Sequence, residues 1–483
     1  MVLDDKALTP KRDSGGGGGG GDGGGPDSAA APRRARWTSR TDFLLATIGN
    51  CVGVGNVWRF PYLCYRNGGG SFLVPYFCAL AFIGIPVFLL ELAMGQRFAK
   101  GAVHTYRIIH PRLGGVGVAS TTVTFVTCSY YTVIMAWSVV YMAHSCRSLT
   151  KVPWRGAKND GVESERFWAW QVLHQSTGFE DFGPPGFVNW PLVAGLVLSW
   201  IALYFTTCKG IKSVGKTAYL SSTLPYFLLV ALVVRGVTLE GAGEGLKFYL
   251  QPRLGMLFRV RPWVEASTQI IYSLGVGTGQ MIAFGSTHDS GIVADALTIA
   301  CLNSATSLFA GLAIFSLVGH MAHQRGVAVD DVISSGEGLA FVAYPDGLAQ
   351  LPGAGFWCFV FFAMLFSLAL GSAAAMVESW TTMLRDCDRG AAFVSWSRSN
   401  DAVVMGTCVA GLLTGAVYIT PAGLYWFALV DSYVVWSVFI VIVVETIGVT
   451  RVYGAEKFSR EIYSMTGRQV PRFVEVSWRY VTP

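Results

Sequence analysis

Charged residues are scarce in this sequence. They make up 14% of its 483 residues, whereas hydrophobic residues make up 52%. A soluble chain of this length rarely has such a composition. The net charge is +6, but the basic residues form no face with interleaved aromatic side chains, so nucleic acid is excluded as a partner.

The motifs of catalysis and metal binding are also missing. The ten cysteines form no C-x-x-C pair and no zinc spacing, which indicates small buried hydrophobic side chains. His320 and His323 are three residues apart but have no further ligands nearby, so no metal site is expected there. Glu91 and Glu378 are expected to make internal polar contacts. Neither a Ser-His-Asp arrangement nor a carboxylate pair is present, and we do not expect an enzyme.

Long apolar runs are abundant instead. A helix needs roughly 20 apolar residues to cross a bilayer core, and each of the ten runs reaches or approaches that length. The alternating pattern of a membrane barrel is absent. The sequence therefore predicts an all-α integral membrane protein with about ten transmembrane helices. The runs are 42–63, 71–95, 115–146, 190–208, 217–235, 263–285, 292–322, 353–384, 401–419 and 422–449.

The connections between these runs predict the orientation in the membrane. Lys and Arg are more numerous in the connecting segments that lie on the same side of the bilayer as the N-terminus. Because such segments are usually cytoplasmic, both ends of the chain are expected to be cytoplasmic. Residues 1–36 form a Gly-rich segment that is expected to be a disordered cytoplasmic tail. No signal peptide precedes the first run, which would itself act as the membrane signal. Residues 37–450 would form the transmembrane core and 451–483 a cytoplasmic amphipathic segment.

Glycine residues interrupt two of the runs at corresponding places, the first and the sixth. These interruptions lie at 48–56 (IGNCVGVGN) and 272–279 (YSLGVGTG). Three glycines within a few residues weaken a helix, by about 1 kcal/mol each relative to alanine. Such paired interruptions are typical of the central site of a transporter. The alternative is close helix packing through small residues. A dinucleotide loop is rejected because no strand flanks the second run.

An unwound helix inside a membrane frees backbone groups that need partners. The freed carbonyls suit a hard cation such as sodium, and the freed N–H groups suit the carboxylate of a substrate. Asn56, Ser273 and Asn303 offer further oxygen ligands in apolar runs, where amides are costly unless they are used. The pattern therefore favours a site for sodium and a small anionic or zwitterionic substrate.

At this point the sequence resembles a known family. Residues Asn50–Gln96, with the motifs GNVWRFPY and NGGG, look like the first two helices of the neurotransmitter:sodium symporter family (solute carrier 6). The likeness runs from about Trp37 to Pro483. It implies the LeuT-type fold, a five-plus-five inverted repeat with helices 1 and 6 unwound at the midplane. The segments that resemble the glycine, proline and broad neutral amino acid carriers are YLCYRNGGG, VRGVTLEGA, QIIYSLGVG, NSATSLFAG and GLAFVAYP.

The resemblance implies roles for individual residues. The first sodium site would use the Cys51 carbonyl, Asn56, Ser273 and Asn303. The second would use the carbonyls of Gly49, Val52 and Leu368 and the Ser372 hydroxyl. Chloride would lie among Tyr76, Gln269, Ser273 and Ser307. The substrate would contact Gly53, Thr127, Tyr131, Tyr272, Gly275 and Thr278. The outer gate would be Arg59 with Asp431, and the inner gate Arg34 with Asp386.

The sequence departs from the family pattern in three places. Gly371 stands where many members have an aspartate at the second sodium site, which puts the occupancy of that site in question. Thr287 replaces a tyrosine that usually follows helix 6. The phrase 478–483 matches the family sequence just before helix 11, so we expect ten family helices here and no helix 11 or 12.

The function expected from these features is import of a small neutral amino acid across the plasma membrane, coupled to sodium and chloride, with no organic cofactor. Monoamine carriers have an aspartate where this chain has Gly53. Glycine is ranked first, proline second and other neutral amino acids third. One alternative is a truncated, non-transporting relative that assembles with full-length transporters. Homo-oligomers are also possible partners, and a channel is disfavoured because gate pairs are expected at both ends.

Overall fold

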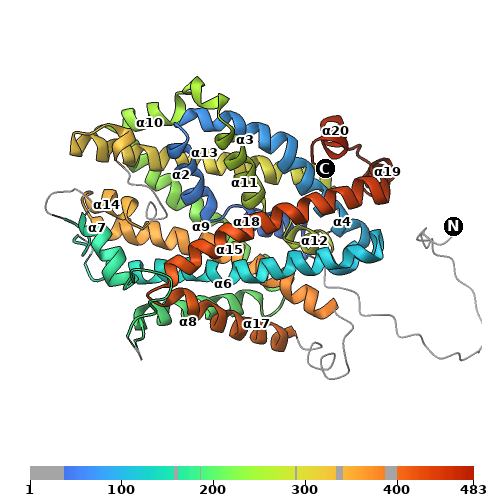
Figure 1. The fold of residues 1–483 in the computed structure, drawn as a ribbon, viewed down its shortest axis with the longest axis horizontal. Coiled ribbons are helices and arrows are strands. Elements are labelled where there is room, and N and C mark those ends of the chain that lie inside the picture. Colours follow the sequence, from blue (N-terminus) through green and yellow to red (C-terminus); the bar gives the residue numbers. More distant parts are fainter. Residues whose placement is uncertain are drawn as a thin grey trace, which may run out of the picture. The chain divides into compact units, whose positions relative to one another are not determined.

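The computed structural model describes residues 37–148, 150–156, 162–184, 187–288, 291–332, 341–386 and 400–482. The Gly-rich tail and Arg34 lie outside these residues. Within them every regular element is a helix (Figure 1), and one isolated bridge joins Gly69 to Pro252. The part of the chain discussed below belongs to the unit Ala35–Pro483.

The α-helices are α1 (Arg40–Cys51), α2 (Phe60–Arg66), α3 (Leu73–Ala79), α4 (Ile85–Phe98), α5 (Ala102–Ile109), α6 (Gly114–Ser145), α7 (Val162–Arg166), α8 (Trp190–Thr207), α9 (Ile211–Val237), α10 (Ala242–Leu250), α11 (Val260–Leu274), α12 (Gln280–Gly285), α13 (Ile292–Arg325), α14 (Ala343–Ala349), α15 (Ala354–Asp386), α17 (Asn400–Gly415), α18 (Gly423–Ile447), α19 (Ala455–Thr466) and α20 (Arg472–Tyr480). The π-helical turns are η1 (Gly55–Arg59), η3 (Leu80–Gly84), η5 (Phe167–Val172) and η10 (Gly448–Gly454). The 3₁₀ turns are η2 (Gly70–Phe72), η4 (Pro111–Leu113), η6 (Leu254–Phe258), η7 (Val329–Asp331) and η9 (Ala416–Ile419).

Eight continuous helical stretches in the described residues are long and apolar enough to cross a membrane. They correspond to eight of the ten apolar runs in the sequence. They are Gly70–Phe98, Pro111–Ser145, Trp190–Thr207, Ser213–Val237, Ile292–Arg325, Ala354–Asp386, Asp401–Ile419 and Gly423–Thr466. The first and sixth runs are not among them because each is divided. Helix α1 ends at Cys51 and helical structure resumes at Gly55, whereas α11 ends at Leu274 and α12 begins at Gln280.

Backbone conformation explains the second of these breaks. Gly275, Gly277 and Gly279 have φ angles of +64°, +76° and +71°. L-residues with side chains rarely adopt this left-handed region, so glycine is required at all three positions. In the first break Val52 leaves the helix with φ −84° and ψ +87°, which ends the hydrogen-bond ladder of α1. Close packing through small residues does not by itself account for these glycines.

The two broken segments lie among long helices. Helix α6 packs along α15, and α1 packs against α9, α13 and α15. Helix α12 contacts α4 and α15, while α11 contacts α3. Figure 1 shows the short α11 and α12 in the middle of the helical assembly, near α15 and α18. This packing places both breaks in the interior.

The C-terminal segment packs onto the second apolar run. The Trp478 indole donates to the Pro86 carbonyl at 2.9 Å, and Arg97 pairs with Glu461 at 2.9 Å. The helix α18 continues without a gap through η10 into α19. The expected boundary at residue 450 therefore falls inside a continuous helical stretch, because the π-helical turn carries the chain past it.

Candidate functional site

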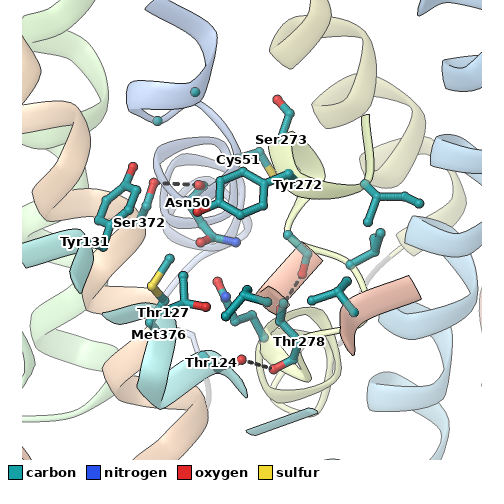
Figure 2. Close-up of a pocket in the computed structure, with 18 of the residues that line it drawn as sticks. Asn50, Cys51, Thr124, Thr127, Tyr131, Tyr272, Ser273, Thr278, Ser372 and Met376 are labelled. Carbon is teal, nitrogen blue, oxygen red and sulfur yellow. Dashed lines mark hydrogen bonds between the residues drawn. The ribbon is translucent and has the colours of Figure 1, made fainter. Parts of the chain in front are cut away.

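A small cavity of about 50 Å³ lies between the two helix breaks. Its walls come from α1, η1, α6, α11, α12, α15 and α18. All six residues that were predicted to contact substrate line it, and so do four predicted sodium ligands (Figure 2). The substrate residues are Gly53, Thr127, Tyr131, Tyr272, Gly275 and Thr278, and the sodium ligands are Cys51, Asn56, Ser273 and Ser372.

The first sodium set forms one buried cluster of oxygen-bearing side chains. Asn56 donates from Nδ2 to the Asn303 side-chain oxygen at 2.7 Å and to its carbonyl at 3.1 Å. Asn303 in turn donates to the Ser273 hydroxyl at 2.9 Å. Asn56 and Asn303 are fully buried, and Ser273 nearly so. Amide and hydroxyl oxygens held in this way suit a hard cation.

The second sodium set lies where α1 approaches α15. The Ser372 hydroxyl donates to the Asn50 carbonyl at 2.8 Å. A side-chain carbon on Gly371 would lie 2.5 Å from the Gly49 carbonyl oxygen. Glycine at 371 therefore permits the close approach of the two helices, and an aspartate there would require them to move apart. The remaining members of the set, Val52 and Leu368, are also buried.

The predicted chloride residues are all buried and lie beside the first sodium set. Ser307 accepts a hydrogen bond of 2.8 Å from Asn56. Gln269 donates to the Gly55 carbonyl at 3.3 Å, and its own side-chain oxygen has no partner in the described part of the chain. The Tyr76 hydroxyl contacts Ser304 at 3.2 Å. The set carries no carboxylate, so its charge is neutral.

The cavity end nearest η1 offers donors to a carboxylate. The Tyr131 hydroxyl accepts from the Val54 N–H at 3.2 Å, which places both groups at the first break. A side-chain carbon on Gly53 would lie 2.6 Å from the Ser372 hydroxyl and 2.9 Å from the Tyr131 hydroxyl. Position 53 therefore has no room for a side chain, and the Gly53 N–H on the cavity wall donates to the Asn56 side chain at 3.0 Å.

A larger cavity of about 440 Å³ adjoins Tyr131 and Tyr272 and holds both predicted outer-gate residues. Arg59 lies over the Tyr272 ring, 4.8 Å from its centre. Asp431 accepts a hydrogen bond of 2.9 Å from Tyr130, whose hydroxyl lies 3.0 Å from that of Tyr272. Among the described residues Arg59 and Asp431 form no direct ion pair. The two tyrosines connect them, and direct pairing remains a prediction for a closed state.

We expect a charge swap of Arg59 and Asp431 to restore more transport than either single reversal. Each reversal alone places two like charges on one cavity, whereas the swap keeps opposite charges there. Uptake by Arg59→Asp, Asp431→Arg and the double variant, corrected for the amount in the membrane, measures this. Arg66→Asp on the same cavity is the matched control, because its partner is Glu265. Equal loss in the singles and the double would contradict closure by direct pairing.

The inner end holds contacts that the resemblance did not supply. Asp386 accepts from the Gly101 N–H at 3.0 Å, while its predicted partner Arg34 lies outside the described residues. Arg40 at the start of α1 pairs with the buried Asp295 of α13, with 3.0 Å between Nε and Oδ1. His288 contacts the other oxygen of Asp295 at 3.0 Å. The structure therefore ties α1 to α13 at this end.

Several cavity residues were missed by the sequence analysis. Thr124, Gln280 and Met376 line the central cavity, and Thr124 donates to the Thr278 carbonyl at 2.7 Å. Glu91 of α4 accepts a hydrogen bond from the Gly277 N–H in the second break. Its position in an apolar run was the available signal, since a buried carboxylate needs a partner. A second carboxylate of this kind, Glu378, pairs with Arg385 at 3.3 Å.

The sequence profile of the Sodium:neurotransmitter symporter family matches residues 34–165 and 157–483, which is nearly the whole chain. The chain belongs to this family. The LeuT-type membrane fold expected above is the fold of the family, and its members are transporters and not enzymes. Sodium is the coupling ion in the family's own description.

Curated relatives in the family resemble the chain to similar degrees. The sodium- and chloride-dependent glycine transporter 2 of Xenopus laevis is 35% identical over 93% of this chain and 63% of its own length. The sodium- and chloride-dependent GABA transporter 2 of Bos taurus is 37% identical over 94% of this chain and 79% of its own length. The sodium- and chloride-dependent taurine transporter of Bos taurus is 36% identical over 94% of this chain and 77% of its own length. The chain therefore spans under two thirds of the length of the glycine transporter and about three quarters of the length of the GABA and taurine transporters. These three relatives are named for different substrates.

Proposed function

We propose that this protein is a sodium- and chloride-coupled symporter that imports a small zwitterionic amino acid across the plasma membrane, with both termini cytoplasmic. One observation carries the proposal. The cavity between the two helix breaks is lined by all six predicted substrate residues and adjoins the buried cluster of Asn56, Ser273 and Asn303. Family membership supports the sodium coupling. This arrangement favours transport over a non-transporting relative.

The first break supports a zwitterion as the substrate class. No carboxylate lines the central cavity, so an amine without its own carboxylate would lack a counter-charge there. A zwitterionic amino acid brings a carboxylate that can lie against the first sodium, the Tyr131 hydroxyl and the N-terminal end of η1. The small size of the central cavity favours an amino acid with a small side chain. Glycine, ranked first from the sequence, and proline, ranked second, are both in this class. The GABA named for one relative is also a zwitterion with a carboxylate, whereas the taurine named for another is a zwitterion with a sulfonate.

Chloride coupling is supported by the neutral set around Ser307. Two sodium ions and a zwitterion would bring positive charge into a site that has no carboxylate of its own beside Asn56. A bound anion would balance that charge in a region of low dielectric constant. The relatives reported above are named as chloride-dependent. We include in the same proposal that sodium binds at the second site, where this chain has Gly371.

Labelled amino acid uptake by cells that express the full chain tests the proposed function. Uptake of a neutral amino acid mixture should exceed that of untransfected cells and should be lost when sodium is replaced by choline. Unlabelled glycine, proline, serine, alanine, dopamine and serotonin are then added one at a time as competitors of the labelled amino acids. Inhibition by the amines together with no inhibition by any amino acid would contradict the zwitterion class.

Gly53→Asp should reduce amino acid uptake by more than tenfold. The new side chain has no room beside Ser372 and Tyr131, and its charge would repel the substrate carboxylate. Gly115→Asp near the start of α6 is the control, because nothing lies within 4 Å of a side-chain carbon there and Gly115 lines neither of the two cavities described above. Normal uptake by Gly53→Asp at equal membrane levels would show that the substrate carboxylate binds elsewhere.

A further inference from the structure

A buried histidine lies at the inner end of the molecule, where α1 meets α13. The His288 ring stacks on Phe43 of α1, with 3.7 Å between the ring centres and 17° between the ring planes. Its Nε2 lies 3.0 Å from Asp295 Oδ2, and the side chains of His288 and Asp295 are 3% and 0% exposed. Arg40 of α1 contacts the same carboxylate, with 3.0 Å between Nε and Oδ1. One carboxylate on α13 therefore binds both a permanent cation and a titratable ring.

His288 directly follows Thr287, which stands where the family usually has a tyrosine. The Thr287 hydroxyl donates to the Phe284 carbonyl at 3.1 Å, within its own segment. The same carbonyl accepts from the Trp37 indole at 3.3 Å, just before α1 begins. This contact and the stacking of His288 on Phe43 join the segment after α12 to the start of α1. Together with the pair of Arg40 and Asp295, they form what we call the inner contact.

Other charged groups near this end have partners of their own or face solvent. Helices α1, α4, α9 and α15 pack against α12 or α13. Asp289, the next residue in the chain, lies outside the described residues. In the part that the structure describes, Arg40 and Asp295 form the charged pair at His288. The partnered groups are Asp42 with Tyr219, Arg97 with Glu461, Arg385 with Glu378 and Asp386 with the Gly101 N–H, and the exposed lysines are Lys100, Lys209 and Lys216.

A path from the inner side to the central cavity requires the start of α1 to leave α13. This movement takes Arg40 away from Asp295 and Phe43 away from His288 at the same time. Loss of one partner leaves a buried carboxylate without its cation, which is strongly unfavourable and resists opening. His288 does not belong to α1, so it stays with Asp295 when α1 moves. A proton on His288 would then supply the positive charge that Arg40 no longer provides.

The closed arrangement does not favour the same proton to the same degree. The carboxylate of Asp295 already has Arg40 as its cation there, and a charged His288 would bring a second positive charge close to the first. The attraction of a charged ring to Phe43 is weaker than the repulsion between two neighbouring cations. Protonation therefore stabilises the open arrangement more than the closed one, and it shifts the equilibrium toward the open one. Histidine is the side chain whose charge changes near neutral pH.

We propose that His288 is a positioning residue of the inner contact: the neutral ring holds Asp295 in place for Arg40, and the protonated ring promotes separation of α1 from α13. Acidification on the inner side therefore raises the fraction of molecules that are open at this end. The proposal rests on the proposed function only for the use of this opening in transport. The contacts that carry it involve neither the coupling ions nor the substrate.

Distances between spin labels test the proposal without substrate. The purified full chain in lipid nanodiscs is labelled at Thr38→Cys, before α1, and at Thr298→Cys on α13, both at exposed positions. The exposed Cys146 and Cys301 are replaced by serine. In sodium-free buffer the ratio of long to short distances should rise by at least about fivefold when the pH falls from about 8 to about 6. A ratio that stays constant over this range would overturn the proposal.

Variants distinguish the titration of His288 from a structural role. His288→Gln keeps a donor for Asp295 but takes up no proton, so the distances should stay short at every pH. His288→Lys keeps a positive charge, so the long distance should dominate at every pH. Asp295→Asn removes the carboxylate and should also abolish the pH response, which provides the test if the lysine variant does not fold. His110→Gln is the control, because His110 is an exposed histidine beside η4, and it should respond to pH as the parent does.

Two results would overturn the assignment to His288. One is a pH response that persists in both His288→Gln and Asp295→Asn. The other is a folded His288→Lys protein that shows only the short distance.

The outcomes also separate this inference from the proposed function. Opening that depends on pH in a protein without sodium-driven uptake would support the role of His288 and contradict symport. Sodium-driven uptake by a protein whose label distances do not change with pH would support symport and overturn the role of His288.

Discussion

Asn56→Ala is expected to abolish sodium-driven amino acid uptake at physiological sodium. The Asn56 side chain is fully buried and holds the first break together: it accepts from the Gly53 N–H at 3.0 Å and donates to Asn303 and Ser307. Alanine would remove a predicted sodium ligand and leave Asn303 without its donor. Loss of one such hydrogen bond in a buried site costs about 1–3 kcal/mol, so sodium affinity should fall by about 5- to 150-fold.

Sodium titration of uptake measures this effect, with surface labelling to count the protein that reaches the membrane. Asn303→Ala should behave in the same way, because the two amides share a hydrogen bond. Asn189→Ala is the matched control: Asn189 is also buried and bonded to a backbone carbonyl, but it starts α8 outside the cavity. It should lower the amount of protein and leave sodium affinity unchanged. Unaltered sodium affinity in both Asn56→Ala and Asn303→Ala would remove the first sodium site from this place.

Ser307→Glu should make transport independent of chloride. Ser307 is fully buried, 2.8 Å from Asn56 Nδ2, and no carboxylate belongs to the predicted chloride set. A glutamate there would supply a fixed negative charge next to the first sodium, which is the role proposed for the anion. Replacing chloride by gluconate should then stop uptake by the parent and leave uptake by the variant nearly unchanged.

Ser307→Gln separates charge from size. Its side chain has the same shape as glutamate but no charge, so it should not transport without chloride. If Ser307→Glu still needs chloride as the parent does, the anion site lies elsewhere. If the glutamine and glutamate variants both lose the requirement, the effect of the substitution is steric and the electrostatic explanation is wrong.

Most of the helical architecture was predictable because hydrophobic length is a strong signal. Eight of the ten apolar runs are long helices in the described residues, and the two that are not are the ones with glycine interruptions. The sequence did not reveal why three glycines are needed in the second break, since positive φ values depend on the local backbone path. The predicted end of the core at residue 450 remains a prediction, and residue 450 lies inside the π-helical turn η10. A π-helical turn has no clear sequence signal.

The residues of the candidate site were predictable where they belong to family motifs. Two arguments selected Asn56, Ser273 and Asn303: their polar side chains are costly in apolar runs, and they match the family motifs. The structure brings the three residues into one cluster. The positions of Asn50 and Gln280 on the wall of one cavity were not predictable, because they depend on how α1 and α12, which lie far apart in the sequence, pack against each other.

Contacts that depend on the conformational state were also beyond the sequence. Motifs pair Arg59 with Asp431, but in this structure Arg59 lies on the Tyr272 ring and Asp431 bonds to Tyr130. The Arg40 contact with Asp295 joins positions that no motif links. Side chains at gates exchange partners as a transporter opens and closes, so one sequence is compatible with more than one arrangement.

Uptake by purified protein in sealed lipid vesicles tests the central claim of coupled symport most directly. The vesicles contain potassium gluconate, and the labelled amino acid that the expressing cells take up best is added outside in sodium chloride. The account predicts accumulation above the outside concentration, and a loss of accumulation when sodium alone or chloride alone is replaced outside. Equal uptake with and without the sodium gradient, or filling only to the outside concentration, would contradict symport.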